Sequence, residues 1–110
     1  MSITHIVLFQ FKQGAAAGAI QDACQNMLSL TDRCMHPATG GPYIQAASGG
    51  RDNSPEGAQG GITHAFVVEF ATGADRDFYV AQDPVHKEFV KSLDGLVERA
   101  QVIDFTPGVL

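Results

Sequence analysis

Residues 3–12, ITHIVLFQFK, restrict the fold more than any other stretch, because their side chains alternate with period two. One face carries His5 together with large apolar residues, and the other carries Ile6 and Leu8. A strand with one face in water would be polar on that face. We therefore expect a strand whose two faces are both covered.

Two segments have the period of a helix. Residues 15–34 place apolar residues at helical spacing and polar residues on the opposite side. Residues 74–82 open a second helical region, which Asp83 and Pro84 interrupt before it resumes over 84–100. Aspartate suits the N-cap of a helix, and proline suits its first turn. The sequence thus predicts a helix that restarts at this pair.

Three further strands are expected, at 43–48, 62–70 and 101–107, and residues 49–61 are predicted to form a surface loop. The order strand, helix, strand, strand, helix, strand is that of the ferredoxin-like βαββαβ plan. The sequence therefore predicts one α+β domain over residues 1–110, with a four-stranded antiparallel sheet and both helices on one face.

The other face of this sheet is predicted to be apolar. Ile6, Leu8, Ala65 and Val67 would lie exposed on it in a monomer. Exposed apolar patches of this kind mark interfaces. We therefore expect a homodimer in which two sheets pack face to face around a two-fold axis.

Charge and composition exclude several classes of partner. The net charge of −5, with 7 scattered basic residues, argues against nucleic acid and against a basic membrane-surface helix. No stretch approaches the ~20 apolar residues of a membrane span, and the first segment lacks a signal peptide's basic leader. Reduced Cys24 and Cys34 in the cytoplasm are expected. Cys34 and His36 alone make a weak case for a metal, so no metal is predicted.

Four stretches over nearly the whole chain read THIVLFQF, GGRDNSPEG followed by GGITHAFVVEF, DPVHKEFVKSL, and VIDF. Together they resemble the stress-responsive A/B barrel (Dabb) family, and the middle loop looks most like that of fungal members. The resemblance implies a ferredoxin-like protomer and a homodimer that closes an α+β barrel.

The resemblance also implies a site. The family's olivetolic acid cyclase-type enzymes fold a linear polyketide by aldol condensation, with neither a metal nor an organic cofactor. Their catalytic histidine ends a P-x-H segment, which here ends at His86, and two further pocket histidines match His5 and His64. Tyr79 lies one place from the family's catalytic tyrosine, and Asp83 replaces a family histidine.

We expect His5, His64 and His86 to share an apolar pocket between sheet and helices. The helix N-terminus and burial lower the pKa of His86, whereas the carboxylate of Asp83 opposes both. A neutral His86 could take a proton from a carbon next to a carbonyl, while Tyr79, His5 or His64 donates to the enolate oxygen. The substrate would be a hydrophobic or phenolic small molecule. The predicted apolar lining consists of Phe9, Phe11, Met27, Leu28, Phe66 and Phe89.

Other interpretations stay open at this point. Each histidine can be a buried imidazole bonded to a neighbour, and Tyr79 can be a packing residue. The chain would then be a non-catalytic homodimer that binds a hydrophobic ligand or serves in a stress response. A cofactor-free monooxygenase of the same architecture is a further alternative, although fold alone is poor evidence for function. An enclosed cavity joining His86 to His5 or His64 would favour the enzyme.

Overall fold

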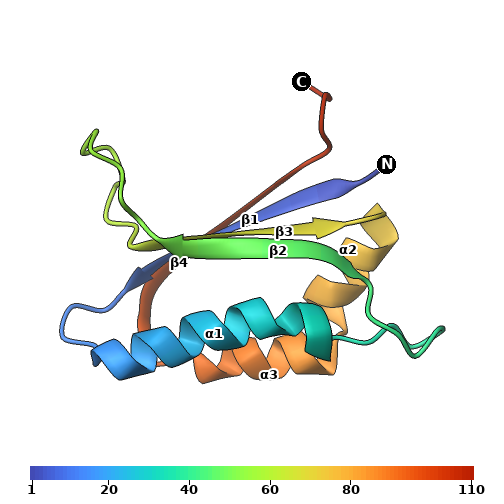
Figure 1. Ribbon diagram of the computed structural model, residues 1–110, viewed down its shortest axis with the longest axis horizontal. Coiled ribbons are helices and arrows are strands. Elements are labelled where there is room, and N and C mark those ends of the chain that lie inside the picture. The colour runs from blue at the N-terminus through green and yellow to red at the C-terminus, as the bar shows by residue number, and fades with distance from the viewer.

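The computed structural model describes residues 1–110, which form four strands and three helices (Figure 1). The elements follow in the order β1 (Ile3–Phe11), α1 (Ala17–Arg33), β2 (Ile44–Arg51), β3 (His64–Phe70), α2 (Gly73–Ala81), α3 (Pro84–Ser92) and β4 (Val97–Phe105). The longest helix, α1, has 17 residues. None of the three helices combines the length and apolar character needed to cross a membrane.

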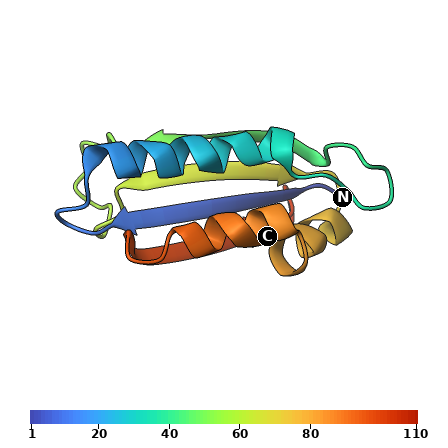
Figure 2. The ribbon, with the colours of Figure 1, turned by 90° about the horizontal axis from the view of Figure 1, so that it is seen from below.

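The four strands form one antiparallel sheet in the order β2-β3-β1-β4, as the ferredoxin-like plan requires. All three helices lie on the same side of it (Figure 1). Figure 2 shows α1 crossing the half of the sheet that contains β2 and β3, while α3 crosses the half that contains β4. The predicted fold class is confirmed, and it leaves the second face of the sheet without cover.

The last helix is shorter than predicted. It ends at Ser92 instead of residue 100, and β4 starts at Val97 instead of residue 101. Gly95 has a φ of 81°, a left-handed conformation that terminates helices readily. The apolar residues beyond it continued the helical pattern by coincidence, since Val97 and Ala100 pair with β1.

The second strand is longer than predicted. Its final residues, Gly49 to Arg51, were expected in the loop but belong to β2. Gly49 pairs with Phe66, and Arg51 pairs with His64. Strand pairing here overrides the low strand propensity of glycine.

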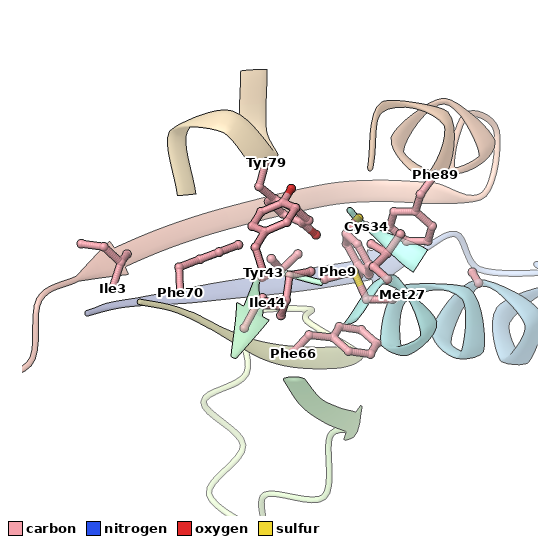
Figure 3. Packing of buried hydrophobic residues seen from close by; sticks show 14 of the residues in the cluster. Ile3, Phe9, Met27, Cys34, Tyr43, Ile44, Phe66, Phe70, Tyr79 and Phe89 are labelled. Carbon is pink, nitrogen blue, oxygen red and sulfur yellow. The ribbon is translucent and has the colours of Figure 1, made fainter. Parts of the chain in front are cut away.

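The core lies between the sheet and the helices and is rich in aromatic rings (Figure 3). Phe66, Phe70 and Tyr79 are 1%, 0% and 0% exposed. The rings of Phe70 and Tyr79 lie 5.0 Å apart, which joins β3 to α2. These contacts fix α2 against the sheet, and with it the side chain of Tyr79.

The uncovered face is apolar, as predicted. Ile6, Leu8 and Val67 are partly exposed on it, and Ala65 is exposed. β4 extends this surface, because Ile103 pairs with Ile6 and is 58% exposed. The apolar patch therefore runs across three strands.

Candidate active site

His86 is placed by the start of α3. Asp83 is the N-cap, and its Oδ1 accepts hydrogen bonds from the backbone N–H of Val85 at 2.9 Å and of His86 at 3.3 Å. Pro84 follows in the first turn, where its missing N–H costs nothing. This local sequence starts the helix where predicted and sets the His86 ring beside α2.

The rings of His86 and Tyr79 stack on each other, with centroids 3.9 Å apart and planes 28° apart. The Tyr79 hydroxyl and the His86 Nδ1 are both buried, and neither has a hydrogen-bond partner. Buried polar atoms are nearly always paired in native proteins. Two adjacent exceptions in one layer call for an explanation, and a bound polar group would supply it.

Both groups are electrically neutral at neutral pH. Burial lowers the pKa of His86 from its ordinary 6.5, and nearby His5 acts in the same direction. The backbone of Tyr79 and the carboxylate of Asp83 oppose this shift without reversing it. Burial also raises the pKa of the Tyr79 phenol, so its proton stays bound. The pair therefore offers a free base beside a protonated donor.

His5 belongs to the same neighbourhood. It is 4% exposed, and its ring lies edge-on to Tyr79 with centroids 5.8 Å apart. Its Nδ1 lies 2.6 Å from Asp104 Oδ1, and Arg76 holds the other oxygen of that carboxylate at 2.7 Å. A carboxylate at Nδ1 favours the tautomer with its proton there, which leaves Nε2 as the acceptor.

Asp104 and Arg76 were missed from sequence. The register provides the signal, since β4 pairs with β1 and brings Asp104 opposite His5. Once β4 is known to start at Val97, the alternation along the strand predicts this contact.

The buried carboxylate of Asp83 fixes the start of the helix that carries His86. Asp83 is 1% exposed and accepts a hydrogen bond from the hydroxyl of Tyr43. Cys34 lies nearby, and burial, with the Asp83 carboxylate second, raises the pKa of its thiol to about 12. A thiol with so high a pKa is not a nucleophile. Tyr43 and Cys34 thus hold Asp83, and Asp83 holds the start of α3.

His64 lies elsewhere, so the expected meeting of three histidines is wrong. It pairs with Phe9 at the far end of β1 from His5. Its Nδ1 lies 3.0 Å from Thr63 Oγ1, and burial together with the charge of Arg51 lowers its pKa. The strands place His5 and His64 on one face but at opposite ends of it.

The predicted lining divides in the same way. Phe9, Met27 and Phe89 are 3%, 4% and 5% exposed and fill the core between the two ends. The other residues of the lining border an open groove of about 990 Å³ beside His64, namely Phe11, Leu28 and Phe66.

The hollows of the surface follow the same division. A separate hollow of about 510 Å³ lies beside His5, Val80 and Asp104. His86 and Tyr79 border none of the four main hollows. The layer around this pair is therefore packed, although His86 itself is partly exposed.

The comparison with protein families gives one match. The family described as "Stress responsive A/B Barrel Domain" matches residues 3–107. No curated protein matches the sequence.

Solved structures match over almost the whole chain. The Arabidopsis thaliana protein At3g17210 is 27% identical over 98% of this chain and 97% of its own, with a TM-score of 0.82. The hydroxynitrile lyase from Passiflora edulis is 21% identical, covers 99% and 96%, and has a TM-score of 0.83. A dimeric ferredoxin-like protein of unknown function from Jannaschia sp. CCS1 is 18% identical, covers 96% and 99%, and has a TM-score of 0.74.

Proposed function

Because the chain belongs to the stress responsive A/B barrel domain family, we propose that it is a cofactor-independent enzyme acting on a small carbonyl compound. The proposed chemistry is that of a polyketide cyclase or a related lyase or isomerase, with His86 as general base. Tyr79 is the proposed hydrogen-bond donor. A hydroxynitrile lyase among the structural relatives is consistent with lyase chemistry on this fold.

One observation carries the proposal. The Tyr79 hydroxyl and the His86 Nδ1 are both buried without partners, on rings that stack with centroids 3.9 Å apart. Each such atom costs the folded state about 1–3 kcal/mol relative to a paired one. Two such atoms on neighbouring rings support a role for this pair in binding a ligand oxygen and in taking the proton next to it.

The reaction would proceed through an enolate. His86 takes a proton from the carbon next to the carbonyl, the C–H electron pair forms the C=C bond of the enolate, and the carbonyl π pair moves onto the oxygen. The Tyr79 hydroxyl donates a hydrogen bond to that oxygen and stabilises the charge. In a cyclisation the enolate carbon then attacks a second carbonyl carbon of the same molecule. The oxygen of that carbonyl receives the proton back from His86, so no oxidant or external acid is needed.

Substrate binding requires the Tyr79 ring to leave its stacked position. The hollow beside His5 lies next to it and is bordered by Val80 and Ala81 of the same helix. Asp104 holds His5 there at 2.6 Å. A substrate that enters this hollow would contact His5 first and reach His86 when Tyr79 moves.

Deuterium exchange tests the proposal without knowledge of the natural substrate. The acetyl group of the phenolic ketone resacetophenone carries protons next to a carbonyl, and NMR in heavy water follows their loss. We expect the protein to accelerate exchange, and we expect His86→Gln to abolish the acceleration. His36→Gln is the matched control, because His36 pairs with Asp75 and borders none of the four main hollows. Equal rates with and without His86 would remove it from the mechanism.

A non-catalytic ligand-binding protein is the second candidate. It is favoured by the packing around His86 and by the open groove at the other end of the molecule. Binding of resacetophenone without any exchange would decide for this candidate.

We also propose that the chain forms a homodimer through its uncovered sheet face. The face is apolar over three strands, with Ile103 58% and Phe105 45% exposed. The structural relative from Jannaschia is described as dimeric. Two such faces packed together would bury the patch and close the barrel that the family's description names.

A further inference from the structure

The groove beside His64 is larger than the other three main hollows and is separate from the proposed catalytic pair. It holds about 990 Å³ and lies between α1 and the strand ends that carry Phe11, Arg51 and His64. Sites for small molecules typically measure about 300–1,000 Å³. The groove is therefore large enough for a ligand of its own.

One wall of the groove is apolar and open to solvent. Ile20, Cys24 and Leu28 follow one another at helical spacing on α1, and all three border the groove. Leu28 is 37% exposed, while Ile20 and Cys24 are partly exposed. Together with Phe11 this wall offers contact to a hydrocarbon body.

Glycines in β2 form the bare wall opposite. A Cβ at Gly49 would lie 2.6 Å from the carbonyl oxygen of Ala65 and 2.8 Å from Phe66 Cγ, so no side chain fits there. Gly50 borders open space and also carries no side chain. Glycines inside a strand often mark a close approach of a ligand or another backbone. Here they keep the groove open along the strand.

The groove has an excess of positive charge in an acidic protein. Arg51 and Lys12 both border it, and neither forms an ion pair. Glu98 is the single carboxylate of the lining, whereas the chain as a whole carries a net charge of −5. Two unpaired cations beside an apolar wall match an anion with an apolar body.

His64 adds an acceptor. Thr63 Oγ1 has one proton, which it donates to the Phe9 carbonyl at 3.1 Å. The 3.0 Å contact from His64 Nδ1 to the same oxygen therefore requires the proton on Nδ1. The Nε2 of neutral His64 is left as an acceptor, and the positive charge of the lining comes from Arg51 and Lys12 alone.

We propose that this groove binds small carboxylates with an apolar body, with Arg51 and Lys12 holding the carboxylate and the α1 wall holding the hydrocarbon. This inference does not depend on catalysis at His86. It concerns the opposite end of the sheet, and loss of either site leaves the other intact.

NMR titration of the labelled protein tests the proposal with three probes of equal chain length: octanoate, octanol and octylamine. We expect octanoate to bind about tenfold more tightly than octanol, with octylamine weakest, and amide shifts to concentrate at the groove residues. Arg51→Gln should weaken octanoate binding about three- to tenfold, the range between an exposed ion pair and a charge-assisted hydrogen bond. It should leave octanol binding unchanged.

Arg33→Gln is the matched control, because it removes the same charge from the far end of α1, outside the groove. Leu28→Gln tests the apolar wall and should weaken octanoate and octanol alike. Equal affinity for octanoate and octanol would overturn the proposal, as would equal loss from the two arginine variants. Shifts confined to the uncovered face around Ile6 and Ile103, or no binding of octanoate, would also overturn it.

Discussion

Removing the Tyr79 hydroxyl should make the protein more stable and less active. Tyr79 is 0% exposed, and its hydroxyl has no hydrogen-bond partner. The unfolded state hydrates it fully, so folding strips its water without replacement. Tyr79→Phe removes that cost and keeps the ring that stacks on His86.

A second buried tyrosine provides the opposite case in the same core. Tyr43 is 5% exposed, and its hydroxyl donates to the buried carboxylate of Asp83. Tyr43→Phe deletes a hydrogen bond to a charged group, and such bonds contribute about 1.5–3 kcal/mol. The two variants remove the same atom from two rings of similar burial. Any difference between them reports the hydrogen-bond partner.

We expect Tyr79→Phe to raise the free energy of unfolding by about 1 kcal/mol and Tyr43→Phe to lower it by about 2 kcal/mol. Urea unfolding at one fixed protein concentration measures both, because dimerisation would couple stability to concentration. The slope of the transition should stay unchanged. If Tyr79→Phe is destabilised as much as Tyr43→Phe, the Tyr79 hydroxyl has a partner and the reasoning about an unpaired site is refuted.

Three further predictions follow from other parts of the fold. Burial lowers the pKa of both His64 and His86 below 6.5, so the unfolded chain binds more protons. Stability should therefore be complete above that pH and decline as the pH falls through it, and His86→Gln should reduce the decline in a pH series of urea transitions. Gly49→Ala should lower the free energy of unfolding by about 1–3 kcal/mol, because its Cβ would lie 2.6 Å from the Ala65 oxygen. Gly50→Ala should leave the free energy of unfolding nearly unchanged in the same assay, because nothing lies within 4 Å of its Cβ. Ile103→Glu should convert the proposed dimer to a monomer in sedimentation experiments. Val90→Glu, at a similarly exposed position on α3, should leave the dimer intact. A dimer that persists in Ile103→Glu would place the interface elsewhere.

The sheet and helices could be predicted from sequence because their patterns are local. Alternation along residues 3–12 fixed the face that His5 shares with the core, and the Asp83–Pro84 pair fixed the start of α3. The predicted ends of β2 and α3 were wrong, because they depend on strand pairing and on backbone conformation rather than on the local pattern. Gly49 and Gly50 join a strand only because β3 lies beside them, and the end of α3 depends on the left-handed Gly95.

The candidate site was only partly predictable for the same reason. The alternation of the strands correctly predicts that His5 and His64 share one face of the sheet. It does not give the register, which places the two histidines at opposite ends of that face. Tyr79 contacts His86 although its spacing differs from the family pattern, because α2 and α3 are two helices joined at Asp83. Asp104 and Arg76 became visible only with the pairing of β4 to β1.

A crystal structure of the protein with bound resacetophenone would test most directly whether the unpaired atoms form the reaction site. The account predicts that the ketone oxygen lies within hydrogen-bond distance of the Tyr79 hydroxyl. The acetyl carbon should lie beside His86, and the two rings should no longer be stacked. A ligand bound only in another hollow, with Tyr79 still lying against His86, would contradict it.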